Sequence, residues 1–214
     1  MAPSGIAPID SVTGGIPKGA LTQVCSPRWN SSGKTALLLS LVAQTTNQGE
    51  FCALVDAGDC FDPLSAEAAG ISLSHLLWVR CSQRGSVPAL EQAFKAADIL
   101  MQNGGFGLVA VDLGNQEERL VRKIPLTTWF RFSRVIEKMP TALVFLAPDA
   151  YAHSCSALTL HLASIRPRWD RIASVSHGRL LDGMDFEAEI TRARLKKPVA
   201  SAKPKFTARA EWLG

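Results

Sequence analysis

Short apolar runs alternate with helical patterns through residues 20–150, and this rhythm allows few folds. The runs expected as strands cover residues 20–25, 51–55, 76–79, 108–111 and 142–146, and the expected helices cover 36–49, 65–69, 89–101 and 126–138. Strands that are apolar along their whole length are buried on both faces, and helices between them make consecutive strands parallel. The sequence therefore predicts an α/β fold with a mostly parallel central sheet flanked by helices.

The pattern changes after Leu158 to shorter segments in which apolar and polar residues alternate. Phe186, Ala188 and Ile190, for example, are separated by polar residues. Such alternation is typical of antiparallel strands, which we expect to extend the sheet at its C-terminal edge. The length of 214 residues fits one domain. We expect a core domain over residues 1–197 and a basic, flexible tail over residues 198–214.

Composition narrows the class of protein. Hydrophobic residues make up 47% of the chain and charged residues 20%, which is typical of a globular protein rather than a disordered one. No apolar run reaches the roughly 18–20 residues of a membrane span, and the N-terminus lacks the pattern of a signal peptide. We therefore expect a cytoplasmic protein without a membrane partner. The five cysteines are scattered without a CxxC pair, and the four histidines have no metal spacing, so we expect reduced thiols and no zinc site.

The sequence SSGKT at residues 31–35 lies between an expected strand and an expected helix. In that setting the backbone around Ser32 and Gly33 and the start of the helix form an anion site. Lys34 would then reach the terminal phosphates of a nucleotide, and the Thr35 hydroxyl would bind Mg²⁺. The pattern is incomplete, since Arg28 replaces its first glycine. The alternative is a serine-capped helix with an exposed lysine.

Asp112 ends the apolar run of residues 108–111, where a P-loop protein places the carboxylate that orients water on Mg²⁺. A structural role, as the cap of a following helix, is the alternative. At this distance from the P-loop, Asp112 is the candidate second metal ligand beside Thr35.

Several segments together resemble the RecA family. They are GGIPKGALT at residues 14–22, SSGKT at 31–35, CALVDA at 52–57 followed by Asp62-Pro63, and the segments 156–158 and 162–166. The resemblance covers about residues 9–200. It implies a RecA-like P-loop core, ATP and Mg²⁺ as ligands, binding to single-stranded DNA and self-association. It also implies that Asp62 meets the amino group of adenine.

Other positions depart from the RecA pattern. Gly58 occupies the position of the family's catalytic glutamate, with Asp59 beside it. Ala147 and Pro148 replace the family's Asn-Gln pair, and Ser65 replaces the aromatic residue that stacks on adenine. The segments that match the two DNA-binding loops, 113–125 and 149–155, are short. These departures predict weak or absent ATP binding and a degenerate ATPase, so that no catalytic residue is assigned.

A trimmed RecA-like chain of this kind resembles the ImuA accessory proteins of bacterial DNA-damage-induced (SOS) translesion synthesis. That resemblance implies a scaffold that links an ImuB-like polymerase relative to an error-prone polymerase, in the cytoplasm and near the nucleoid. An active, ATP-dependent recombinase mediator of the RecA type is the alternative, favoured by the intact residues 33–35 and Asp112. A relative of the cell-division inhibitor SulA is a third reading, which the near-complete SSGKT argues against.

Two groups of cations are candidate contacts for DNA or a partner protein. Arg131 and Arg134 are interleaved with aromatic residues over 129–134, a pattern suited to a partner or a nucleic acid, although Trp129 and Phe130 also fit a core position. The second group consists of Arg192, Arg194, Lys196 and Lys197. Residues 165–214 carry eleven Lys and Arg against six Asp and Glu, whereas residues 1–164 carry twelve against thirteen. This second group reads either as a single-stranded DNA groove or as a solvated basic edge strand.

Overall fold

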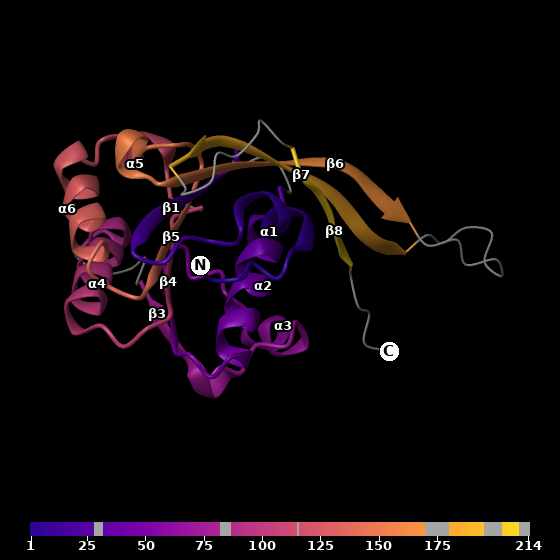
Figure 1. Ribbon diagram of the computed structural model, residues 1–214, viewed down its shortest axis with the longest axis horizontal. Coiled ribbons are helices and arrows are strands. Elements are labelled where there is room, and N and C mark those ends of the chain that lie inside the picture. Colours follow the sequence, from indigo (N-terminus) through magenta and orange to yellow (C-terminus); the bar gives the residue numbers. More distant parts are fainter. Residues whose placement is uncertain (28–31, 82–86, 115, 170–179, 195–202, 210–214) are drawn as a thin grey trace.

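In the computed structural model, the described residues are 1–27, 32–81, 87–114, 116–169, 180–194 and 203–209, and they form a sheet with helices on both faces (Figure 1). The strands are β1 Ala20–Cys25, β2 Cys52–Asp56, β3 Leu76–Arg80, β4 Leu108–Asp112, β5 Ala142–Ala147, β6 Leu158–Trp169, β7 Leu181–Ala193 and β8 Lys205–Arg209. The helices are α1 Ala7–Thr13, α2 Lys34–Asn47, α3 Pro63–Ala68, α4 Ala89–Asn103, α5 Glu118–Arg122 and α6 Leu126–Ile136, with 3₁₀ turns η1 Leu73–His75 and η2 His153–Cys155.

The eight strands lie in the order β3-β2-β4-β5-β1-β6-β7-β8. Every pairing from β3 across to β6 is parallel, and β7 and β8 add antiparallel strands at one edge. The predicted fold class is therefore confirmed. The strands lie where the apolar runs predict them, because a run with no polar face is stable only when helices cover both of its sides.

Two hydrophobic clusters hold the layers together. On one face α4 and α6 pack on the sheet through an aromatic group, in which the Trp129 and Phe145 ring centroids are 4.9 Å apart. On the other face α1, α2 and α3 pack against the sheet, with Leu37 and Leu41 of α2 buried. Helix α6 turns Trp129 and Phe132 inward, whereas Phe130 is 47% exposed. The predicted core position is therefore confirmed for Trp129 and is wrong for Phe130, which faces outward.

Strand β6 differs from the short segments expected after Leu158. Its first residues pair parallel with β1, and the whole strand then pairs antiparallel with β7 through register shifts at Thr159/Leu160, Ser164/Arg166 and Arg168/Trp169. We call residues 163–169 of β6, 181–187 of β7 and β8 the distal ribbon. In Figure 1 it extends beyond the helices.

Residues 205–209, which we expected in a flexible tail, instead form β8. Two long-range contacts explain the difference. The ring of Phe206 packs on that of Phe186 with centroids 5.3 Å apart, and Thr207 pairs with Asp185 of β7. Pro204 directly precedes the strand, a position that tolerates a missing N–H. The expected boundary at residues 197/198 lies outside the described residues, and the division into core and tail stays a prediction.

Asp185 joins the three strands of the distal ribbon. Its carboxylate accepts hydrogen bonds from Arg166 Nε at 2.9 Å, Arg168 Nε at 2.6 Å and Thr207 Oγ1 at 2.7 Å. The hydroxyl of Thr207, followed by the guanidinium groups of Arg166 and Arg168, holds the pKa of Asp185 well below its usual range. The ionised carboxylate is therefore the form that stabilises the ribbon.

We predict that Asp185→Asn lowers the Tm at pH 7, because an amide loses the charge that the two arginines share. A depressed pKa gives stability that is present above the unfolded value, near 3.9, and is lost as the pH falls through the folded value. The Tm difference should therefore stay constant from about pH 8 to about 5 and narrow below about pH 4. Thermal unfolding followed by circular dichroism checks this, with the exposed Asp182→Asn on the same strand as control. An equal difference at pH 3 and pH 7 would contradict it.

Candidate functional site

The carboxyl ends of the parallel strands lie side by side along one end of the sheet, where open α/β sheets bind ligands. The register places Asp56 at the end of β2 beside Asp112 at the end of β4, and Cys25 at the end of β1 beside Ala147 at the end of β5. The helix α2 starts from this same edge after β1. The residues predicted from the P-loop pattern and the strand-ending carboxylates are thus neighbours in space.

The N-terminus of α2 is built to receive an anion. Its N-cap residue, Gly33, has a φ of 79° and, as a glycine, has no side chain that could cap the first turn. The first N–H groups of a helix point away from its body, so a helix N-terminus can bind a phosphate. Ser32 is buried and its hydroxyl oxygen accepts a hydrogen bond from the Ser26 hydroxyl at 2.5 Å, while Thr35 lies exposed in the first turn. Arg28 and Ser31 lie outside the described residues.

The ammonium group of Lys34 lies between the ends of β1 and β5. It donates to the carbonyl of Ser26 at 3.2 Å and to that of Ala147 at 3.5 Å. It is also close to Asp112: a Cβ placed on Gly114 would be 3.0 Å from Asp112 Oδ1 and 3.6 Å from Lys34 Nζ. The two residues that the sequence assigns to phosphate and metal binding therefore face the same small space.

The carboxylate of Asp112 is held in a low-dielectric position. Burial raises its pKa, and the negative charge of Asp56 raises it further, while the Gly114 N–H, 2.8 Å from Oδ1, and the charge of Lys34 oppose the rise. A divalent cation would offset this burial, and Asp112 with Thr35 would hold Mg²⁺ in the way that P-loop proteins use. The helix N-terminus, the lysine ammonium, the threonine hydroxyl and the carboxylate are the kinds of group that bind a nucleotide with its magnesium ion. When bound, the ion would supply positive charge at the phosphates.

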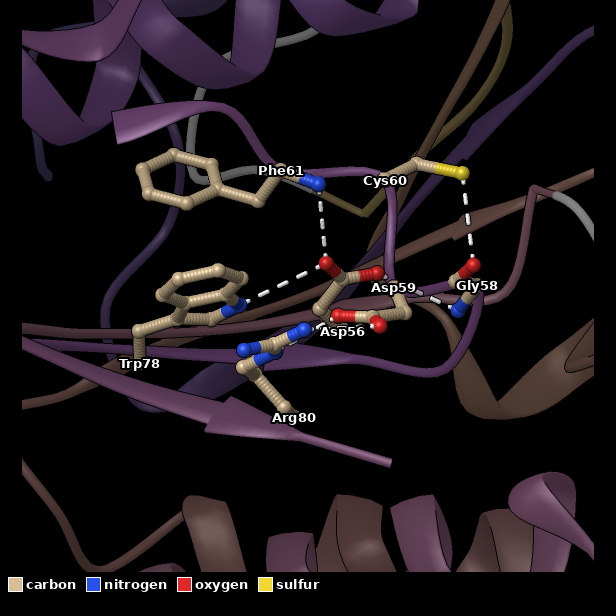
Figure 2. A network of polar contacts seen from close by, with 7 residues as sticks. All are labelled: Asp56, Gly58, Asp59, Cys60, Phe61, Trp78 and Arg80. Carbon is tan, nitrogen blue, oxygen red and sulfur yellow. Dashed lines mark hydrogen bonds and ion pairs between the residues drawn. The ribbon is translucent and has the colours of Figure 1, made fainter. Parts of the chain in front are cut away.

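The loop after β2 is organised by Asp56, a buried residue (Figure 2). One oxygen of its carboxylate accepts from the Gly58 N–H at 3.1 Å, and the other accepts from the Phe61 N–H at 2.8 Å and from Trp78 Nε1 at 3.4 Å. Three donors fix the carboxylate in place. Asp56 therefore has a structural role, which its position at the end of a strand did not reveal.

Asp59 lies in the same loop and is paired with Arg80 of β3 (Figure 2). Arg80 Nε is 2.7 Å from Oδ1 and Arg80 Nη2 is 2.9 Å from Oδ2, a bidentate arrangement. The hydrogen bond from Arg80 lowers the pKa of Asp59. The backbone at Asp59 is left-handed, with a φ of 53°, and Arg80 also lies 4.9 Å from the centroid of Trp78. A carboxylate with a lowered pKa and an engaged guanidinium is a poor general base.

Asp62, the residue that the resemblance assigns to adenine, caps α3. Its carboxylate accepts from the main-chain N–H groups of Leu64 and Ser65 and from the Ser65 hydroxyl. A carboxylate has about four lone-pair sites, so most of its capacity is used within the helix cap.

Phe186 of β7 lies against Gly33, a contact that the sequence did not indicate. A Cβ on Gly33 would come within 2.8 Å of the Phe186 ring, so the ring covers this glycine closely. Phe186 itself is 5% exposed. Alternation along β7 predicted an inward side chain at this position, but only the pairing of distant strands brings it to the start of α2.

The exposed face of α6 contains a shallow hollow of about 460 Å³. It is lined by Thr127, Phe130, Arg131, Arg134 and Val135. Arg131 is paired with Asp98 of α4 at 2.6 Å but keeps 56% of its side chain exposed. An exposed aromatic ring between two guanidinium groups is a combination found at protein interfaces.

The C-terminal cations contact the loop before β6. Arg192 Nε donates to the Ser156 carbonyl at 2.9 Å, and Arg194 Nη1 donates to the Ser154 carbonyl at 3.3 Å. Lys196 and Lys197 lie outside the described residues. The structure thus gives Arg192 and Arg194 a role in joining β7 to η2.

Among the described residues, none of the five cysteines is in a disulfide, and no group of three or more His, Cys, Asp or Glu side chains could bind a metal ion. Four of the thiols are buried and Cys60 is exposed. None of the helices in the described part of the chain has the length and apolarity to cross a membrane.

Comparisons with known proteins agree with this fold. A family model described as the RecA N-terminal domain matches residues 2–116. Protein RecA of Ectopseudomonas oleovorans is 40% identical over 99 residues, which are 46% of this chain and 26% of the relative. Protein RecA of Wigglesworthia glossinidia brevipalpis is 24% identical over 217 residues, or 89% of this chain and 62% of the relative. The chain thus spans between about a quarter and three fifths of these relatives. With a matched domain covering more than half of its residues, the chain belongs to the RecA family.

Proposed function

We propose that this protein is a RecA-family accessory protein of DNA-damage-induced translesion synthesis, of the ImuA type, with a degenerate ATPase site. It acts as a scaffold in the cytoplasm, near the nucleoid, and links an ImuB-like polymerase relative to an error-prone polymerase. The observation that carries the proposal is the pairing of Asp59 with Arg80, because it leaves the loop after β2 without an available base.

The argument on hydrolysis starts from the position of the base. Gly58 has no side chain, and the two neighbouring carboxylates are engaged: Asp56 with three donors and Asp59 with Arg80. A positioned general base accelerates a reaction by roughly 10² to 10⁴. Without one, we expect any bound ATP to persist.

Nucleotide binding itself is supported by Ser32, Gly33, Lys34 and Thr35, with Asp112 as the second magnesium ligand. The Lys34 ammonium must exchange its contacts with the Ser26 and Ala147 carbonyls for phosphate oxygens, which offsets part of the binding free energy. Asp62 must share a carboxylate that already caps α3. We therefore propose weak binding of ATP and Mg²⁺.

The α6 hollow is the proposed contact for the ImuB-like partner. Phe130 offers an apolar anchor, and Arg131 and Arg134 flank it with positive charge. Interface hot spots are enriched in aromatic residues and arginine. Arg192, Arg194, Lys196 and Lys197 are the proposed contacts for single-stranded DNA, which would bind through phosphates and lose affinity with salt.

A second candidate function is an active, ATP-dependent recombinase mediator. The closeness of Lys34 Nζ and Asp112 Oδ1 to Gly114 favours it, because both groups of the phosphate and magnesium site are present. In that case the base would come from outside the loop after β2, for example from another copy in an assembly.

We predict that ATP hydrolysis is at least about 100-fold slower than that of the Ectopseudomonas oleovorans RecA protein measured beside it, with or without single-stranded DNA. A phosphate-release assay measures the rate, and binding of a fluorescent ATP analogue to the wild type and to Lys34→Ala measures retention of nucleotide. The Lys34→Ala change should weaken binding and leave the background hydrolysis unchanged. DNA-stimulated turnover that disappears in Lys34→Ala would support the mediator instead.

We predict that Phe130→Asp and Arg134→Glu each weaken binding to the ImuB-like partner by roughly 30-fold, the loss of about 2 kcal/mol expected at a hot spot. Surface plasmon resonance with the purified partner measures the affinity. Leu64→Asp is the matched control, since Leu64 is an apolar helix residue that is 76% exposed on the opposite face of the sheet. Equal affinity of all three variants would show that α6 is not the contact.

A further inference from the structure

Strand β8 is the last strand of the sheet, and within the part of the chain that the structure describes it pairs on one side only, with β7. The Ala188 N–H donates to the Pro204 carbonyl at 2.9 Å. This bond determines which residues of β8 direct their main-chain N–H and C=O groups toward β7. In an antiparallel pair the bonding direction alternates along the strand, so Phe206 and Ala208 turn their main-chain groups toward β7. Lys205, Thr207 and Arg209 therefore turn theirs toward the free edge.

The free edge of β8 borders a groove of about 740 Å³, larger than the hollow on α6. The opposite wall is the outward stripe of α2 together with the start of α1, which run beside β8 in Figure 1. This wall consists largely of small and apolar side chains, among them Ile6, Ala36, Leu39 and Ala43. Strand β8 has five residues, which corresponds to about 17 Å of extended chain.

The two faces of β8 differ in chemistry. Phe206 packs on Phe186 and on the cluster beneath α2. Thr207 points to the other face, where its hydroxyl bonds to Asp185. Side chains alternate along a strand, so Lys205 and Arg209 share the face of Thr207. A strand added to this edge would meet apolar side chains on one face and cations on the other.

Charge argues against a second copy of this chain as that strand. If two β8 strands paired antiparallel around Thr207, Lys205 of one copy would lie opposite Arg209 of the other at both ends. Like charges directly opposite each other destabilise a strand pair, and cations are a common protection of exposed edges against self-association. The same two cations would attract a strand with carboxylates at the matching positions.

We infer that the free edge of β8 binds an extended segment of another protein, in which an apolar residue alternates with polar ones and acidic residues lie opposite Lys205 and Arg209. Main-chain bonds to Lys205, Thr207 and Arg209 would hold the segment, and its apolar side chains would fill the groove over α2. This binding site is separate from the P-loop and from the α6 hollow, and it does not depend on either proposed contact.

The test uses two fluorescein-labelled peptides of equal composition on the full-length protein. The first has the core Glu-Val-Thr-Val-Glu, and the second has the core Val-Glu-Thr-Glu-Val, which shifts the alternation by one residue and turns the carboxylates toward the apolar wall. Fluorescence anisotropy should give a Kd below about 100 µM for the first peptide and at least tenfold weaker binding for the second. Hydrogen exchange should slow at Lys205, Thr207 and Arg209 when the first peptide is bound.

The double variant Lys205→Glu/Arg209→Glu should weaken binding of the first peptide by roughly tenfold or more, because two opposite-charge pairs become like-charge pairs. Lys95→Glu/Lys123→Glu makes the same change of net charge on α4 and after α5 and should leave the affinity unchanged, and thermal unfolding checks that both variants are folded. Equal affinity for the two peptides, or an equal loss of affinity in both double variants, would overturn the inference. It would also be overturned if an oligothymidylate, and not the first peptide, protected residues 205–209 from hydrogen exchange.

Discussion

Strand β1 lies between two parallel neighbours, and the position of its carboxyl end determines the rest of the candidate site. Cys25 is in register with Ala147 on one side and His161 on the other, so pairing with both neighbours fixes the position at which the chain leaves the sheet. The loop to α2 starts there, and Lys34 returns to bond the Ser26 and Ala147 carbonyls. The start of α2 is thereby tied to the ends of two strands. The position of Lys34 at the candidate phosphate site is therefore a consequence of the sheet.

The same edge of the sheet concentrates negative charge, and the chain compensates each carboxylate differently. Asp56 receives three hydrogen bonds, Asp59 is paired with Arg80, and Asp112 is half-buried near Lys34. A catalytic base needs a carboxylate that is both oriented and free to accept a proton. Full compensation stabilises the loop after β2 and removes that freedom. The lack of an available base is the physical reason for proposing that this RecA-family protein acts as a scaffold.

Much of the fold could be predicted because each central strand and helix has a local signal, such as the apolar run that forms β4. What the sequence could not give depends on contacts between distant segments. Strand β8 forms because Phe206 meets Phe186, and α1 is positioned by the bridge between Ala2 and Ile16. In the site, the pattern singled out Lys34 and Asp112, and the structure places both side chains close to Gly114. The pairing of Asp59 with Arg80 depends on the parallel register of β2 and β3, which no single segment contains.

The retained SSGKT is weak evidence for hydrolysis, because most of its described residues have a structural role in this chain. Gly33 must lack a side chain to leave room for the Phe186 ring, and the buried Ser32 bonds to the Ser26 hydroxyl. Lys34 bonds to carbonyls at the ends of β1 and β5. Thr35 is different: it is exposed, and in the described part of the chain no side-chain hydrogen bond is found for it. A hydroxyl at the start of this helix is the group with which P-loop proteins bind Mg²⁺. Thr35 is therefore the residue of the motif that argues most directly for a nucleotide.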